Sequence, residues 1–342
     1  MRVLIVKTSS LGDVIHTLPA LTDAGRAIPG IQFDWLVEEN FAEIPSWHPL
    51  VDRVIPVALR RWRKSIFSKE TRDQFRVFRK LLQSRHYDLV IDAQGLLKSA
   101  LLARMAKGIC CGLDGESARE RAASWFYRHC FSVAKNQHAI TRIRSLFSQA
   151  LHYPMPVSVP NYGLDRAHFE YENKEDPYLV FLHGTTWETK HWPESSWLTL
   201  AKIAHQKGFK IKLPWGNSDE KARAERIAAA CHGVEVLPKL NLKEMASVLA
   251  NAKAAVAMDT GLGHLAAALN VPTVSIYGPT DPKRSGAMGQ AQLHVSAVFP
   301  CAPCFQRRCT HPDRDQSSFP VYAPCFTSTL PVDVWKALES LL

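Results

Sequence analysis

The sequence of 342 residues contains no long apolar run. Only four consecutive apolar residues, "VLIV" at positions 3 to 6, precede Lys7 near the start. No later segment approaches the ~18 uncharged apolar residues that a membrane-spanning helix needs. The pattern argues against both a spanning helix and an export signal. We therefore expect a protein of the cytosol.

Short repeats, low-complexity tracts and nucleic-acid-binding motifs are also missing. The net charge of +10 is uneven, because residues 1–160 hold 23 Lys or Arg against 14 Asp or Glu, whereas residues 161–342 hold 19 against 18. A basic first half suggests a polyanionic partner: nucleic acid, an anionic membrane face or a phosphorylated substrate. Aromatic residues do not alternate with the basic ones as stacking platforms for bases would. A basic nucleic-acid-binding protein therefore remains only as the alternative to an enzyme.

Cysteine occurs eight times, yet without an export signal a disulfide framework is not expected. Four cysteines are predicted to be ordinary buried thiols: Cys110, Cys111, Cys130 and Cys231. The others form the pattern C-x2-C-x4-C-x15-C, namely Cys301, Cys304, Cys309 and Cys325. Four thiolates would suit tetrahedral zinc, but this spacing matches no standard zinc module. A structural metal site or redox-sensitive cluster is the less favoured interpretation.

Short β-rich runs alternate with helical periods and predict parallel sheets covered on both faces. In the first half the runs are 3–6, 33–37, 53–58 and 87–93, and in the second half 178–183, 209–215, 234–238, 254–258 and 273–278. We predict an α/β fold with two doubly wound domains, 1–155 and 178–330. A proline-rich linker, 156–177, and a C-terminal helix, 331–342, complete the predicted organisation.

The loop after the run 254–258 is the most informative one. It contains Asp259, Thr260, Gly261, Leu262 and Gly263, and an alanine-rich helix follows from His264. Glycines let backbone N–H groups approach an anion, and a helix N-terminus adds positive potential, so the loop predicts a pyrophosphate cradle. A tight turn in which Thr260 only caps the helix is the alternative.

A second loop, "LHGTTWETKHWPE" at 182–194, follows the first strand of the same half. Thr185, Thr186 and Lys190 could contact phosphate oxygens, and Lys190 could neutralise charge on a leaving diphosphate. An exposed polar loop that contributes only solubility is the alternative. Because both loops should lie at the same sheet edge, the pair favours a nucleotide site.

Several motifs resemble the lipopolysaccharide heptosyltransferases of glycosyltransferase family 9: "KTSSLGDVIHTLPAL" (7–21), "KHWPE" (190–194) and "DTGLGHLAAAL" with "SIYGPTDP". "RRWRK" (60–64) and "DAQGLLKSA" (92–100) are most similar to type I members. The resemblance implies a GT-B fold, two Rossmann-like domains facing a central cleft. It also implies inverting transfer of L-glycero-D-manno-heptose from ADP-heptose to a Kdo residue of Kdo2-lipid A, in inner-core lipopolysaccharide biosynthesis. We expect a monomer without cofactor or catalytic metal at the anionic cytoplasmic face of the inner membrane. A later-acting, type II heptosyltransferase is the nearest alternative.

The resemblance also implies roles for single residues. Asp13 would be the general base that takes the acceptor proton, although a plain N-cap is the alternative. The donor residues would be Thr185, Thr186 and Lys190 at the diphosphate, Asp259 and His264 at the sugar and its leaving group, Glu220 at the ribose and the main chain near Leu240 at the adenine. The acceptor anions would meet Arg60, Arg61, Lys64 and Arg119, with Trp62 as support. "DRD" at 313–315 mimics a metal-binding D-x-D motif, but we expect it to be solvated charge.

Overall fold

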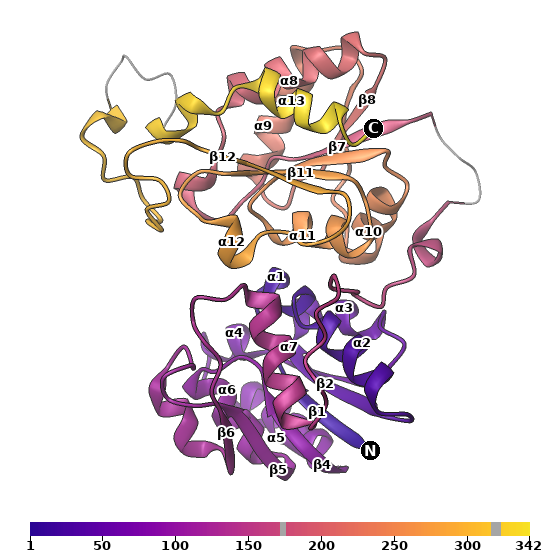
Figure 1. Cartoon of the computed structure of the whole chain (residues 1–342), viewed down its shortest axis with the longest axis vertical. Coiled ribbons are helices and arrows are strands. Elements are labelled where there is room, and N and C mark those ends of the chain that lie inside the picture. Colours follow the sequence, from indigo (N-terminus) through magenta and orange to yellow (C-terminus); the bar gives the residue numbers. More distant parts are fainter. Residues whose placement is uncertain (172–175, 316–322) are drawn as a thin grey trace. The chain divides into compact units, whose positions relative to one another are not determined.

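The structure, a computed structural model, describes residues 1–171, 176–315 and 323–342. The chain divides into two compact units, Met1–Leu164 and Asp165–Leu342 (Figure 1). Each unit is built on one six-stranded sheet whose neighbouring strands are all parallel. Within the described ranges, no helix combines the length and the apolar character needed to cross a bilayer.

The first unit has the strand order β3-β2-β1-β4-β5-β6. Its strands are β1 Arg2–Val6, β2 Gln32–Glu38, β3 Val51–Val57, β4 His86–Asp92, β5 Lys107–Leu113 and β6 His129–Phe131. Its helices are α1 Leu11–Ile15, α2 Leu18–Ala27, α3 Glu43–Ser46, α4 Leu59–Trp62, α5 Lys69–Leu82, α6 Leu97–Met105 and α7 Ala139–Ala150. The order reverses between β1 and β4, so the loops after these two strands flank the crevice where doubly wound sheets bind ligands.

The second unit repeats this winding, with the order β12-β11-β10-β7-β8-β9. Its strands are β7 Tyr178–Leu182, β8 Lys210–Leu213, β9 Val234–Val236, β10 Ala254–Met258, β11 Thr273–Tyr277 and β12 Gln292–Ser296. Its helices are α8 Glu194–Gln206, α9 Ser218–Ala229, α10 Leu242–Ala250, α11 Gly261–Ala268, α12 Pro282–Ser285 and α13 Pro331–Glu339. Here the reversal lies between β7 and β10, the strands that precede the two loops singled out in the sequence.

The central strands are apolar because they are covered on both faces. All residues of β7, β10 and β11 are buried, and Val3–Val6 of β1 are fully buried. Strands buried on both faces read as continuous apolar runs rather than alternating ones. The prediction of two doubly wound α/β domains is confirmed, whereas β5, β6 and β12 were not predicted.

Candidate active site

Asp259 is the centre of a polar cluster in the second unit. It follows β10 and is 8% exposed, and its Oδ2 lies 2.6 Å from Lys190 Nζ. Thr185 from the loop after β7 donates a hydrogen bond of 3.3 Å to the carbonyl oxygen of Asp259. His264 Nε2 lies 4.0 Å from Asp259 Oδ1. The two loops that were predicted to meet at one sheet edge are therefore joined by direct contacts.

The α11 N-terminus differs in detail from the predicted cradle. Thr260 is the N-cap of α11, but its side chain makes no capping hydrogen bond. Gly263 is buried, and a Cβ built on it would lie 3.0 Å from Ala257 Cβ. Gly263 thus lets the helix pack closely on β10, and Gly261 is the residue that begins the helix at the loop. The tight-turn alternative is therefore wrong only in giving Thr260 a capping side chain, because Thr260 does hold the N-cap position and Gly263 serves close packing.

Glu220 and Leu240 lie on the next two strand ends. Glu220 is in the first turn of α9, after β8, and its Oε2 accepts a hydrogen bond of 2.7 Å from Gly216 N. A Cβ on Gly184 would lie 2.6 Å from the Glu220 carboxyl group, so that group sits beside the β7 loop. Leu240 is half-buried between β9 and α10. Thr186, the remaining predicted donor residue, is exposed.

The first unit places Asp13 in the loop region after β1. Ser10, not Asp13, is the N-cap of α1, and Asp13 occupies the third helical position. Its Oδ2 accepts hydrogen bonds of 2.9 Å from both Ser10 N and Ser10 Oγ, while Lys7 Nζ lies 3.8 Å from Oδ1. Burial acts to raise the pKa of Asp13, but Lys7, the Ser10 hydrogen bonds and Arg119 together hold it below its usual range. Asp13 is therefore ionised at neutral pH and able to accept a proton.

The loop after β4 holds this arrangement in place. Gln94 Oε1 accepts hydrogen bonds from the backbone N–H groups of Thr8, at 3.1 Å, and Ser9, at 3.3 Å. Lys7 Nζ donates to the Ala93 carbonyl oxygen at 2.9 Å. The buried Asp92 carboxylate accepts four hydrogen bonds, from Gln94 N, Gly95 N, Ser99 Oγ and Tyr127 OH. The motif "DAQGLLKSA" thus supports the loop that carries Asp13.

The basic run 60–64 is less uniform than its letters suggest. Arg61 forms a two-pronged pair with Glu39, with nitrogen–oxygen distances of 3.1 and 2.9 Å. The Arg60 guanidinium lies over the Phe41 ring, 5.5 Å from its centroid, and Lys64 is exposed. Trp62, expected to support the acceptor site, is instead 8% exposed and packs in the core. The fourth predicted acceptor residue, Arg119, helps to lower the pKa of Asp13 through its positive charge.

The cysteines show no metal geometry. Across the described part of the chain, no group of three or more His, Cys, Asp or Glu side chains could hold a metal ion. Cys301, Cys304, Cys309 and Cys325 form no disulfide. Burial, and after it the nearness of the other three cysteines, raises the pKa of the Cys325 thiol. Cys130, predicted to be buried, is exposed. In "DRD", Asp313 Oδ2 lies 3.6 Å from His311 Nδ1.

Three further residues belong to these clusters, although no motif in the sequence pointed to a role for them. Thr280, after β11, donates a hydrogen bond of 2.7 Å to Asp259 Oδ2. Lys7 and Gln94 organise the loop of Asp13. All three follow apolar runs that predicted strands, and that position was the signal available in the sequence; the structure shows that these strands lie at or next to the points where the strand order reverses.

A model of glycosyltransferase family 9 (heptosyltransferase) matches residues 75–313. Lipopolysaccharide heptosyltransferase 1 of Pseudomonas aeruginosa is 57% identical, over 100% of this chain and 98% of that protein. Lipooligosaccharide heptosyltransferase 2 of Haemophilus ducreyi is 26% identical, over 87% and 89%.

Two solved structures are similar along the whole of both chains, each with 46% identity. The E. coli heptosyltransferase WaaC with ADP has a TM-score of 0.88, and WaaC with ADP-2-deoxy-2-fluoro heptose has a TM-score of 0.85. The coverage is 100% of this chain and 100% of each of those chains. These similarities confirm the resemblance seen in the motifs and the predicted GT-B fold.

Proposed function

The chain belongs to glycosyltransferase family 9, the heptosyltransferases, and on this premise we propose that it moves L-glycero-D-manno-heptose from ADP-heptose to a Kdo residue of Kdo2-lipid A. The chain is a type I heptosyltransferase, because it is 57% identical to a heptosyltransferase 1 and 26% identical to a heptosyltransferase 2. The alternatives, a later-acting heptosyltransferase and a nucleic-acid-binding protein, are correspondingly disfavoured.

One observation supports the proposed binding site for ADP-heptose. The strands of the second sheet run in the order β10-β7-β8-β9, and their loops hold Asp259, Lys190, Glu220 and Leu240 in that order. An ADP-sugar has its parts in the same order: sugar, diphosphate, ribose and adenine. Adjacent strands lie about 4.8 Å apart, so the four loops cover roughly 15 Å. We therefore expect the donor to lie along this edge with the sugar at Asp259.

Lys190 and the α11 N-terminus provide the positive potential for the diphosphate. Lys190 has three donors, so it can keep its contact with Asp259 and still donate to phosphate oxygens. Thr186 adds a hydroxyl donor from the same loop, and Thr185 can donate to phosphate when it gives up its bond to the Asp259 carbonyl oxygen. The negative charge on the diphosphate grows as the bond to the anomeric carbon breaks, and donors aimed at that charge stabilise the transition state.

Asp13 is the proposed general base. Its Oδ2 accepts both hydrogen bonds from Ser10, which leaves Oδ1 to take the proton of the acceptor hydroxyl. The acceptor oxygen then bonds to the anomeric carbon from the side opposite the diphosphate, the carbon–oxygen bond to the β-phosphate breaks, and its electron pair leaves with ADP. One displacement of this kind inverts the anomeric configuration. Lys7 and Arg119 keep Asp13 ionised before the step.

The acceptor brings several anionic groups to the first unit. Arg60, Lys64 and Arg119 are proposed to meet its carboxylates and phosphates, with Arg61 contributing less because Glu39 already engages its guanidinium. A lipid acceptor resides at a bilayer, so we also propose that the enzyme works at the anionic cytoplasmic face of the inner membrane.

Asp13→Asn tests the base directly. The Asn side-chain oxygen can still accept from Ser10 N, so the loop should fold, but the amide cannot take a proton. Turnover with ADP-heptose and Kdo2-lipid A should fall ~10²-fold or more, the usual size of a general-base contribution. Calorimetric affinity for ADP should be unchanged, and Ser10→Ala, which keeps the carboxylate, is the matched control. Near-normal turnover in Asp13→Asn would reduce Asp13 to a helix-stabilising residue.

A further inference from the structure

Positive charge is concentrated on one segment of the first unit. Residues 59–82 contain nine Lys or Arg and two Asp or Glu, a net +7 out of the chain's +10. The segment forms α4, α5 and the turn between them, named here the α4–α5 face. Only Arg60, Arg61 and Lys64 of its nine basic residues have a role in the proposed reaction. The others need a separate explanation.

The turn between α4 and α5 also exposes two bulky apolar side chains. Phe67 is 91% exposed and its neighbour Ile66 is 58% exposed. Single exposed apolar residues are ordinary on protein surfaces. Here two of them are adjacent at the tip of a turn and lie in sequence between Arg63, Lys64 and Lys69. This combination is typical of surfaces that enter the boundary between lipid headgroups and acyl chains.

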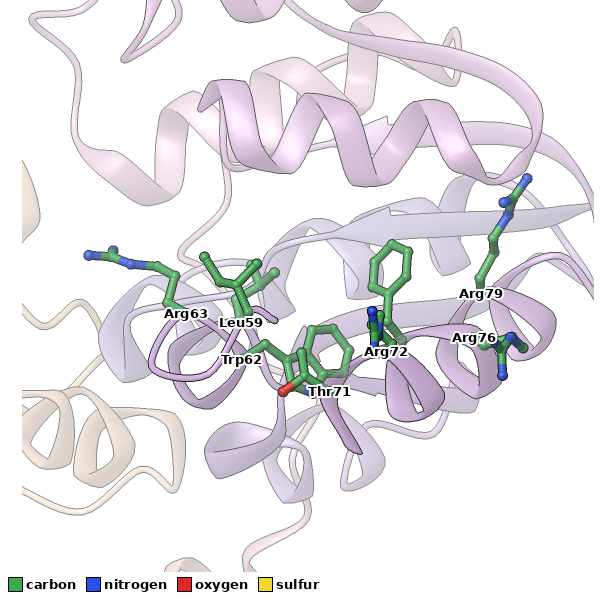
Figure 2. A pocket seen from close by; sticks show the side chains of 9 residues that line it. Leu59, Trp62, Arg63, Thr71, Arg72, Arg76 and Arg79 are labelled. Atoms are coloured by element: carbon green, nitrogen blue, oxygen red, sulfur yellow. The ribbon is translucent and has the colours of Figure 1, made fainter. Parts of the chain in front are cut away.

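A pocket of about 470 Å³ lies beside this turn (Figure 2). Its apolar lining is Leu59, Trp62, Ile66 and Phe75, and its basic lining is Arg63, Arg72, Arg76 and Arg79. Arg63 lies at one end and Arg76 and Arg79 at the other, with Leu59 and Trp62 between them (Figure 2). The rings of Trp62 and Phe75 are 5.8 Å apart, edge to face. The pocket therefore offers an apolar surface with cations at both ends.

The arginines of α5 are available to an external anion. Arg72, Arg76 and Arg79 are spaced by four and three residues, which puts them on one side of the helix. All three are exposed. Arg76 pairs with Asp73 at 2.8 Å, but the two side chains are 69% and 49% exposed. Ion pairs at such exposure are weak and are readily exchanged for another anion.

We propose that the α4–α5 face docks on a bilayer surface through anionic phospholipid. Phe67 and Ile66 enter the headgroup boundary, an acyl segment occupies the pocket, and Arg72, Arg76 and Arg79 meet lipid phosphates. Trp62 is 8% exposed and its ring meets Phe75 edge to face, so neither ring offers an open stacking platform for a base. With the aliphatic Leu59 and Ile66, the lining therefore favours an acyl chain over nucleic-acid bases. This inference rests on the proposed function, because it supplies the contact by which the enzyme would reach a lipid acceptor.

Vesicle co-sedimentation of the full chain tests the proposal without donor or acceptor. Binding to vesicles of phosphatidylglycerol and phosphatidylcholine is compared with binding to phosphatidylcholine alone. Each basic residue near an anionic surface contributes about fivefold, equivalent to ~1 kcal/mol, so Arg72→Gln/Arg76→Gln/Arg79→Gln should bind about 100-fold more weakly. Ile66→Ser/Phe67→Ser removes the apolar side chains that would enter the headgroup boundary, so it should bind about tenfold more weakly. Matched controls are Trp125→Ser, another exposed aromatic, and Arg104→Gln/Lys107→Gln/Arg128→Gln, which removes three exposed charges outside the face.

Wild-type binding that requires anionic lipid, falls in both face variants and persists in both controls would support the docking surface. Equal binding by wild type and face variants would overturn it, as would equal losses in the controls. A larger rise in KM for acylated than for deacylated acceptor, with vesicle binding unchanged, would assign the pocket to the acceptor and also overturn the proposal. The rate of heptose transfer to a deacylated, water-soluble Kdo acceptor tests the proposed function independently of membrane binding. This rate should be unchanged in the face variants.

Discussion

Lys190→Met should separate the structural role of Lys190 from its role at the diphosphate. The substitution leaves Asp259 as a buried carboxylate without its cation, since Lys190 and Asp259 side chains are 13% and 8% exposed. Removing one partner of a buried pair costs about 3–5 kcal/mol. Thr280 still donates to Asp259 Oδ2 at 2.7 Å, so we expect the lower end, ~3 kcal/mol in the free energy of unfolding.

The effect on function has a different size and a different cause. A well-formed hydrogen bond to a charged group is worth roughly 1.5–3 kcal/mol, so ADP affinity should fall about 10- to 150-fold. Turnover should fall further, by ~10²- to 10³-fold, because Lys190 faces charge that develops in the transition state. Calorimetry with ADP, steady-state kinetics and urea unfolding give the three quantities.

A double variant separates the two roles of Lys190. Lys190→Met/Asp259→Asn removes the uncompensated carboxylate, so stability should recover to within ~1 kcal/mol of wild type, whereas ADP affinity should stay low. Asp259→Asn alone should retain most of the ADP affinity, because Asp259 is assigned to the sugar that ADP lacks. Wild-type ADP affinity in the double variant would show that Lys190 serves only the ion pair, and the diphosphate assignment would be wrong.

Three other perturbations have expected outcomes. Arg60→Ala and Lys64→Ala should each raise the acceptor KM about tenfold and leave the ADP-heptose KM unchanged. Arg61→Ala should raise the acceptor KM less. Equal rises in KM for both substrates would contradict acceptor binding. Lys7→Met should raise the pKa of Asp13, so the acid limb of the kcat/KM profile should move to higher pH, and an unmoved limb would contradict the assigned base. Burial lowers the pKa of His48 to about 4. Because the unfolded histidine binds a proton near pH 6.5, the stability contributed by His48 should be complete above that pH and be lost, about 3 kcal/mol, toward pH 4. Burial also lowers the pKa values of His183 and His191 to about 4, so His48→Gln should reduce the slope of stability against pH in urea unfolding without removing it.

The sequence was sufficient where one physical pattern dominated. Nine strands were predicted, most directly the central ones, because strands buried on both faces form continuous apolar runs, as in β10, "AAVAM", where all five residues are buried. Strand β5, "KGICCGL", contains two glycines and two cysteines, and β12, "QLHVS", is an edge strand that is largely solvated. Neither composition is typical of a buried strand, so both were missed. Edge strands need less apolar sequence because only part of their surface is covered.

Site residues were predictable where loops follow central strands, and less so where a role depends on long-range contacts. Asp259 and Lys190 lie far apart in the sequence and were found because their loops follow adjacent strands. That Ser10 caps α1 instead of Asp13, that Glu39 engages Arg61 and that Trp62 is buried depend on rotamers and neighbours that no local pattern encodes. Gly263 resembled an anion-binding glycine, but close packing on Ala257 explains it.

Heptose transfer by one inverting displacement is best tested by analysis of the product. The purified chain is incubated with ADP-heptose and Kdo2-lipid A, and the lipid product is analysed by mass spectrometry and by the NMR coupling and chemical shifts of its anomeric centre. An inverting transfer should add one heptose residue to Kdo, with anomeric configuration opposite to that of the donor and with release of one ADP. A product with retained configuration, or hydrolysis of ADP-heptose without any heptosylated lipid, would contradict it.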